Sequence, residues 1–281
     1  MEYLGRTPAP PLETFVERIW YCSEAPLHRS QRLLPGGGNV DLVINLGEDE
    51  IRSYDATNPE SVLAYSSAVV AGTRTRSYLT DPRQRASAVG VHFRPGGAFA
   101  FLGISPSEIV DANVQLDDLW GCDGRNLREQ LLEAGSPSER FRLVEAALLR
   151  RLRRARPGHP AARAALEAFR AGGNAVRVAD VATIVGLSRR RFIEVFETEV
   201  GLTPKLYARL QRFHRVKQHI AALGEPQSWA TFAVACGYYE QSHMIRDFVE
   251  FSSMSPVSYL RGRTGETMFD HVVHAYPRNP A

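Results

Sequence analysis

Two short stretches near the C-terminal end carry side chains suited to reading a DNA duplex. The candidate residues are Arg189, Arg190, Arg191, Glu194, Gln241, Ser242, His243 and Arg246. Arginine forks onto guanine or clamps phosphate, glutamine pairs with adenine, and a carboxylate accepts from the cytosine amino group. Three consecutive arginines at the start of a helix oppose its macrodipole, which favours a functional reason for their presence.

The two stretches belong to two copies of one unit. The matched residues of the first copy are Ala182, Gly186, Leu187, Phe192, Phe196, Pro204 and Tyr207. Those of the second copy lie 51 or 52 residues later and are Ala233, Gly237, Tyr238, Met244, Phe248, Pro256 and Tyr259. A repeated helix, glycine turn and helix predicts two helix-turn-helix units that read two segments of one duplex.

Local signals define the helices of each copy. In the first, Gly186 ends a helix that begins near Val178, and Ser188 caps a second helix over 189–200. In the second, we expect helices over 228–236 and 240–251, separated by Gly237.

A helix that begins at Pro204 and ends near Leu223 is expected to connect the copies. It would be ~28 Å long, close to one DNA turn of ~34 Å. Its basic residues are expected to meet the DNA backbone between the grooves; they are Arg209, Arg212, Arg215 and Lys217.

The motifs CGYYEQSHMIRDF and MSPVSYL, with VATIVGLS and TPKLY in the first copy, closely resemble the AraC/XylS family of bacterial transcription regulators. The resemblance covers about residues 160–262. It implies a seven-helix double helix-turn-helix domain, double-stranded DNA with an asymmetric operator as partner, and RNA polymerase as a second partner. Three residues depart from the family pattern. Glu240 replaces the usual Asp, Ser253 replaces a helix-ending Gly, and Glu194 stands where a base-contacting residue often lies.

Composition and charge set limits on the rest of the chain. The 281 residues are 44% hydrophobic and suit two domains. Residues 1–145 carry 14 basic against 20 acidic side chains, and residues 146–281 carry 20 against 11, which fits a C-terminal module that binds a polyanion. We expect a cytoplasmic protein without a signal peptide or membrane span. The three scattered cysteines predict no disulfide, metal site or cofactor.

The fold class expected is α+β. Strands are predicted over 18–23, 39–46, 62–70, 76–79 and 86–93, and they suggest a β-rich domain, a cupin-like barrel or sandwich, over residues 1–104. Helices over 106–111, 124–133 and 137–155 predict a connector or dimerisation region and linker over 105–158. The DNA-binding domain is expected over 159–265 and a tail over 266–281. The Gly36-Gly37-Gly38 run lacks the Lys-Ser/Thr ending of a phosphate loop and predicts a hairpin turn.

The function of the N-terminal half is left open. Its motifs LPGGGNVDLVINLG and VGVHFRPGGA resemble the sensor-like region of a subgroup of the same family. One alternative is an effector site, for which the polar candidates are Asp41, Asn45, His92 and Arg94. A second is a module for protein contacts alone, including a homodimer. A third is a DNA-repair enzyme fused to the DNA-binding module, which would need a reactive cysteine. We expect no catalytic residues.

Overall fold

Two β-sheets form the N-terminal half. A computed structural model describes residues 2–23, 31–55, 61–80, 86–171, 177–263 and 268–269 of the chain. The larger sheet has the strand order β1 (Glu2–Arg6), β2 (Val16–Ser23), β9 (Ser87–Phe93), β4 (Asp41–Asn45), β7 (Ala68–Ala71) and β10 (Asn113–Gln115). The smaller has the order β11 (Met268–Phe269), β3 (Gln31–Leu33), β8 (Tyr78–Thr80), β5 (Glu50–Asp55) and β6 (Val62–Ser66). All neighbours are antiparallel except β11 and β3.

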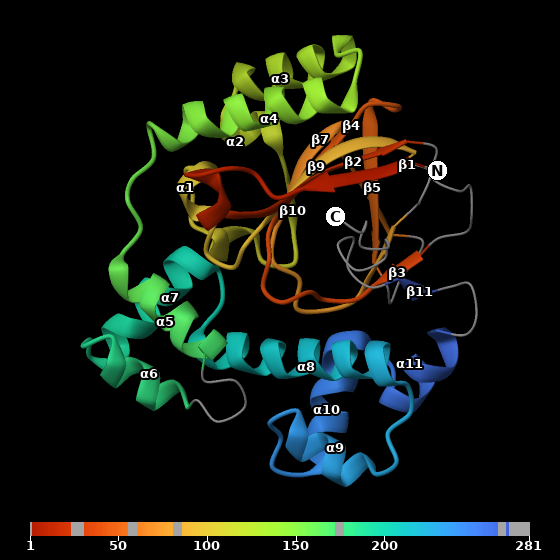
Figure 1. Ribbon diagram of the computed structural model, residues 1–281, viewed down its shortest axis with the longest axis vertical. Helices are drawn as coiled ribbons and strands as arrows, with labels where there is room; N and C mark the ends of the chain where they lie inside the picture. The colour runs from red at the N-terminus through yellow and green to blue at the C-terminus, as the bar shows by residue number, and fades with distance from the viewer. Residues whose placement is uncertain are drawn as a thin grey trace.

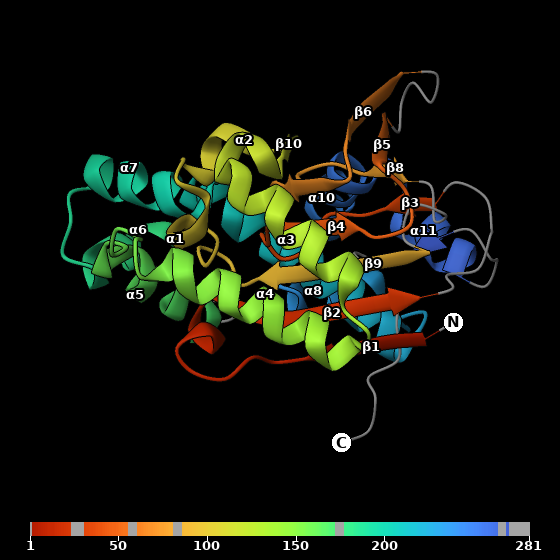
Figure 2. The same cartoon turned by 90° about the horizontal axis from the view of Figure 1, so that it is seen from above.

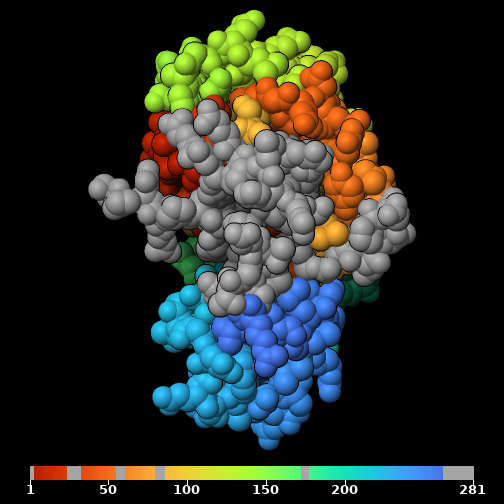
Figure 3. Space-filling view, turned by 90° about the vertical axis from the view of Figure 1, so that its right-hand side faces the viewer, coloured from red at the N-terminus to blue at the C-terminus, as the bar shows by residue number. Residues whose placement is uncertain are grey.

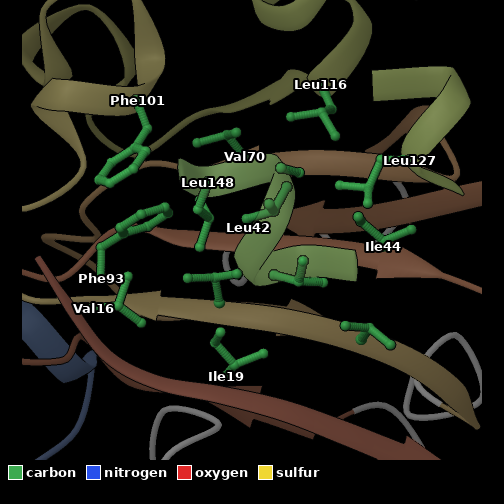
Figure 4. Packing of buried hydrophobic residues seen from close by; sticks show 14 of the residues in the cluster. Val16, Ile19, Leu42, Ile44, Val70, Phe93, Phe101, Leu116, Leu127 and Leu148 are labelled. Atoms are coloured by element: carbon green, nitrogen blue, oxygen red, sulfur yellow. The ribbon is translucent and has the colours of Figure 1, made fainter. Parts of the chain in front are cut away.

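Helices cover one face of the larger sheet. They are α1 (Phe99–Leu102), α2 (Leu116–Trp120), α3 (Cys122–Glu133) and α4 (Pro137–Leu152). Alternate residues of β4 and its neighbours point to this face, where Leu42, Ile44 and Val70 pack with Leu127 and Leu148 (Figure 4). The opposite face of the larger sheet meets the smaller sheet. Figure 2 shows α3 and α4 along the larger sheet and the β5–β6 pair projecting away from it.

The C-terminal part is helical. Its elements are α5 (Pro160–Ala171), α6 (Val178–Ile184), α7 (Arg189–Val200), α8 (Pro204–Leu223), α9 (Trp229–Ala235), α10 (Gln241–Ser252) and α11 (Pro256–Arg263). In Figure 1, α5, α6 and α7 gather at one end of the long α8, and α9, α10 and α11 gather at the other. Figure 3 shows the last of these helices, in blue, as a lobe at the opposite end of the molecule from the yellow-green helices α3 and α4. The α+β class with an all-helical C-terminal part is confirmed.

One continuous core joins the two ends of the helical part. It contains Phe192 and Phe196 of α7 together with Met244 and Phe248 of α10. The middle of α8 supplies the buried residues between them, including Phe213, whose ring centroid lies 5.0 Å from that of Phe248. Because interiors are close-packed, this shared core holds the two helical units as one body.

The N-terminal half docks on the helical part through several contacts, two of which involve α8 and α7. Leu34, which follows β3, is buried in the helical core, and the Gln211 side chain of α8 donates a 2.5 Å hydrogen bond to the Gly37 carbonyl. The short helix η3 (Pro106–Ile109) lies against the end of α7, where the Ser105 hydroxyl donates to the Thr198 carbonyl over 2.8 Å.

Two predictions about the β-rich half are wrong. The expected strand over 62–70 divides at Ser67 into β6 and β7, which belong to different sheets, because the Ser67 carbonyl turns to accept from the Asn45 backbone N–H. The expected hairpin at Gly36-Gly37-Gly38 is absent. β3 pairs with β8 and β4 pairs with β7 and β9, so the glycines cross from one sheet to the other beside α8. The predicted helix over 106–111 is the shorter η3.

Candidate nucleic-acid interface

The first helix-turn-helix unit consists of α6, a turn at Gly186 and α7. Gly186 has φ +68°, a left-handed conformation that glycine adopts without steric cost. The predicted cap of α7 is confirmed, since the Ser188 hydroxyl accepts from the Arg191 N–H over 3.3 Å. The buried side of α7 includes Phe192 and Phe196, so its other side faces away from the core.

The exposed side of α7 carries a small charge cluster. Glu194 Oε1 accepts from Arg190 Nε at 3.1 Å, and Glu194 Oε2 accepts from Arg191 Nη1 at 3.4 Å. Hydrogen bonds from Arg190 and Arg191 lower the pKa of the Glu194 carboxyl. Arg189 is exposed as well. One carboxylate therefore orients two of three arginines and leaves this side of α7 with a net positive charge.

The second unit repeats this arrangement with other side chains. Ser228 caps α9, Gly237 has φ +88° in the turn, and α10 follows. Ser242 and Arg246 are exposed, and they lie one helical turn apart on α10. The Ser242 hydroxyl donates to the Glu240 carboxylate. Gln241 and His243 are half-buried, and the His243 ring lies edge-on to Tyr238 at 5.4 Å.

A buried carboxylate fixes α10 to α8. Asp247, whose side chain is 2% exposed, accepts from Arg209 Nε at 3.1 Å and from Arg209 Nη2 at 2.8 Å. Arg209 Nη2 also contacts Glu250 at 2.5 Å, and these partners raise the pKa of the guanidinium further above its ordinary value. Arg212 lies 3.8 Å from the second oxygen of Asp247 and over the Tyr238 ring. This cluster sets the orientation of the second recognition helix.

A groove of about 890 Å³ runs between the two units. Its lining includes Val178 of α6, Ala208 of α8, and Gly237 and Tyr239 of the second turn. The basic side chains that line it are Arg177, Lys205, Arg209, Arg212, His243 and Arg246. Tyr239 is 92% exposed beside this groove. The groove thus forms a positively charged surface from the start of α6, along α8, to the second turn and α10. Such a surface is complementary to a phosphate backbone.

Not every basic residue of α8 reaches this surface. The expectation that Lys217 meets a DNA backbone is wrong: the residue is 1% exposed, with its ammonium over the Phe213 ring. Arg215 donates to the Cys236 carbonyl over 3.1 Å, and burial lowers the pKa of its guanidinium. Arg215 thus links α8 to the second unit, whereas Lys217 is buried within the core.

The polar candidates of the N-terminal half do not converge on one site. Asp41 and His92 are cross-strand neighbours and form a buried hydrogen-bonded pair. The Asn45 side chain accepts from the backbone N–H groups of Gly47 and Glu48, which closes the turn after β4. Arg94 donates to the Glu13 carbonyl over 2.9 Å.

Comparisons with known proteins agree with this geometry. Residues 181–262 match the family model of a helix-turn-helix domain, and residues 5–115 match that of a domain of unknown function, DUF6597. The probable transcriptional regulator LumQ of Photobacterium leiognathi is 31% identical over 84 residues, which are 30% of this chain and 33% of that protein. The match thus spans about a third of the relative's length. The family match therefore identifies the C-terminal region as a helix-turn-helix domain.

Two solved structures are also similar to this chain. A transcriptional regulator from Chromobacterium violaceum is 24% identical, covers 38% of this chain and 95% of its own, and has a TM-score of 0.34. ToxT from Vibrio cholerae is 14% identical, covers 94% of this chain and 98% of its own, and has a TM-score of 0.45.

The AraC-type motif located the exposed residues of both recognition helices, whereas it gave no sign of the ion pairs behind them. The Asp247 cluster joins residues 38 positions apart and depends on how α8 crosses α10. The one available signal in the sequence was the acidic residue Asp247 beside the apolar residue Phe248 on the same helix.

No helix in the described part of the chain is long and apolar enough to cross a membrane.

Proposed function

We propose that this protein is a sequence-specific DNA-binding transcription regulator whose AraC-type domain places α7 and α10 in successive major grooves. The observation that carries the proposal is the basic groove between the two helix-turn-helix units, which runs from Arg177 just before α6, along α8, to the recognition helix α10. Recognition helices specify sequence through base edges, and basic residues between them fix the register on the phosphates.

Each recognition helix has its own chemistry. On α7, Arg190 and Arg191 face the bases or flanking phosphates, with Glu194 as their orienting partner and an acceptor for cytosine. On α10, Arg246 is the strongest candidate for guanine, and Gln241 and Ser242 stand beside it. Arg189 and His243 complete the proposed contacts at the ends of these helices.

Arg212 belongs to the groove wall between the helices. Its guanidinium sits near Asp247 and over Tyr238 with a side chain that is 23% exposed. This placement supports a phosphate contact in the middle of the site better than a contact to a base.

The N-terminal half is proposed to control the DNA-binding domain through an effector or a protein partner. Its docking on α8 at Gly37 and on α7 at Thr198 supports this role. We propose RNA polymerase and a second copy of the chain as further partners, and the cytoplasm as the place where the regulator acts.

The proposed domains are a β-rich domain over 1–104, a connector or dimerisation region and linker over 105–158, the DNA-binding domain over 159–265 and a tail over 266–281.

An enzyme of the alkyl-transfer type has weaker support. Such an enzyme needs an accessible thiolate. Burial raises the pKa of the Cys236 thiol to about 11, so it stays protonated at neutral pH. Cys22 is buried as well, and Cys122 is exposed at the start of α3. We include no catalytic step in the proposal.

The test is an electrophoretic shift series with the full chain on an operator selected from random DNA. Arg190→Ala and Arg246→Ala should each weaken operator binding by about 1–3 kcal/mol and change binding to random duplex far less. Arg125→Ala is the matched control, since Arg125 is an exposed arginine on α3, paired with Asp117. Equal losses on operator and random DNA would contradict a base-reading role.

A further inference from the structure

A small cavity lies between the two β-sheets of the N-terminal half. Its volume is about 50 Å³. Val43, Val69 and Ala71 of the larger sheet and Ile51 and Leu79 of the smaller sheet form its apolar walls. The polar side chains at the cavity are Arg52, Ser53, Arg74, Tyr78 and Asn113. Since a water needs roughly 10–15 Å³, the space would hold about three or four waters, which is the size of a carboxylate with a short alkyl group.

Arg74 is the unusual residue of this cavity. It is 7% exposed, its Nη2 donates to the Asn113 side chain, and its guanidinium lies 4.7 Å from the Tyr78 ring centroid. Its Nε is buried without a hydrogen-bond partner. A guanidinium carries five N–H donors and is always charged, so most of its bonding capacity is unused.

Neighbouring carboxylates do not neutralise Arg74. Within the described ranges no ion pair involves this residue. Asp111, the nearby acid, accepts from the backbone N–H of Thr75 over 2.6 Å and contacts Arg76 Nε at 3.5 Å. Arg52 at the cavity is already paired with Glu50. A buried charge without a partner is costly, whereas Arg209 in the same chain has two carboxylates.

We propose that Arg74 binds the carboxylate of a small organic acid in this cavity. The planar fork of the guanidinium matches a carboxylate in geometry and charge. The apolar walls fit a short alkyl group behind it, while phosphate would leave charged oxygens against valine side chains. This inference rests on the proposed function, because it names the chemical class of the effector sensed by the N-terminal half.

The cavity is connected to the recognition helix α7 through η3. Asn113, the partner of Arg74, lies on β10, and Asp111 just before it is bonded to the segment that carries Arg74. The chain before Asp111 forms η3, which contacts Thr198 of α7 through Ser105. A carboxylate that engages Arg74 therefore acts on the segment that docks on the DNA-binding domain.

The experiment is calorimetric titration of the full chain with sodium propionate, against sodium chloride at equal ionic strength. We expect saturable binding at one site per chain. Arg74→Gln should weaken it by about 10- to 100-fold, the range for hydrogen bonds to a charged group. Arg74→Lys should bind with intermediate affinity because it keeps the charge and loses the fork. The matched control is Arg76→Gln, an exposed arginine two residues away, which should bind as the parent does.

Further variants and probes complete the test. Ala71→Leu keeps Arg74 and fills the cavity, so it should abolish propionate binding even if Arg74→Gln does not fold. If octanoate binds more tightly than propionate, the cavity holds the carboxylate end of a longer acid. If propionate binds more tightly, the ligand is a short acid. Both results support the proposal. No saturable propionate or octanoate binding, or binding of inorganic phosphate in their place, would overturn it. Operator binding measured on the same samples without acid separates this failure from failure of the proposed function.

Discussion

At the scale of single residues, two carboxylates hold the arginines of the proposed DNA-reading surface in place, one on the surface and one buried beneath it. Arg190 and Arg191 share Glu194 on the exposed side of α7, and Arg209 and Arg212 share Asp247 behind α10. The first carboxylate is exposed and the second is buried. Exposed pairs contribute little to stability, whereas breaking a buried pair leaves a desolvated charge. The two clusters should therefore respond differently to mutation.

Asp247→Asn should destabilise the protein by about 3 kcal/mol, because the change removes the charge that neutralises Arg209 and Arg212 in a buried setting. Urea unfolding followed by circular dichroism measures the loss. Glu250→Gln is the control, since Glu250 contacts the same Arg209 with a side chain that is 53% exposed, and it should cost less than about 1 kcal/mol. Similar losses for the two variants would show that the Asp247 pair is not the anchor of α10.

Glu199 gives a prediction about pH. It accepts from the His159 backbone N–H between α4 and α5, and burial raises the pKa of its carboxyl. The folded state then holds the proton more tightly than the unfolded state, so this group favours unfolding more as pH rises through that range. Glu199→Gln should remove the effect. Its melting temperature should exceed that of the parent most at pH 7, and the difference should vanish near pH 4, about the pKa of a free glutamate.

Glu199→Ala provides the contrast, because it removes the acceptor as well as the charge. It should be less stable than Glu199→Gln by about 1 kcal/mol at both pH values, because neither variant carries the charge and only Gln keeps an acceptor. The difference in melting temperature between the parent and Glu199→Gln should change from pH 7 to pH 4. A constant difference would contradict the raised pKa of the Glu199 carboxyl.

At the scale of elements, a glycine at the end of α7 serves both the helix and the docked N-terminal half. Gly201 has φ +88°, and a Cβ there would lie 3.1 Å from the backbone and side chain of Pro106 in η3. Gly186 in the first turn has φ +68°, and a Cβ there would meet nothing within 4 Å. The two positions share the left-handed conformation and differ in the contact with η3.

Gly186→Ala should therefore lower stability by about 1–2 kcal/mol through backbone strain alone. Gly201→Ala should cost about 1 kcal/mol or more beyond that, because Pro106 must also move. Urea unfolding of both variants measures the difference. Equal losses of unfolding free energy would mean that η3 can move away from residue 201 at no measurable cost, and that its packing against α7 contributes little to stability.

Sequence signals predicted the helical elements far better than the sheets. Ser188 and Pro204 are local cap and start signals, and the helices they predicted begin where expected. The helix expected from residue 228 begins at Trp229, with Ser228 as its cap. Ser253 took the left-handed conformation, with φ +60°, although it replaces the usual glycine. Strand β5 escaped prediction because its sequence, EIRSYD, is polar and half-exposed. The division at Ser67 depends on pairing with strands distant in sequence, which no local pattern encodes.

The candidate sites show the same difference between helices and sheets. The exposed side chains of α7 and α10 follow from helical periodicity together with the repeated motif. Arg74 lies just beyond β7 and stands out in the sequence only as one of several polar residues beside the apolar strands. Its burial arises only when the two sheets close over it. Buried polar sites formed by long-range packing leave no periodic signal in the chain.

At the scale of the whole molecule, the two DNA-reading units are rigidly joined and chemically different. α8 has 20 residues, which is ~30 Å of helix, and the core that it supports runs from Phe196 to Phe248. The unit at one end presents arginines with Glu194, and the unit at the other presents Ser242 and Arg246. A rigid pair of unlike readers fits one asymmetric site in one orientation and at one spacing.

The spacing of the operator tests this directly. Inserting five base pairs between the two half-sites turns the second groove to the opposite side of the duplex, and inserting ten moves it a further ~34 Å, more than α8 can span. Both insertions should reduce affinity to that of one unit in an electrophoretic shift assay with the full chain. Replacing spacer bases without changing its length is the control and should preserve binding. Tight binding after a ten-base-pair insertion would require two flexibly joined readers, which the continuous core around α8 does not permit.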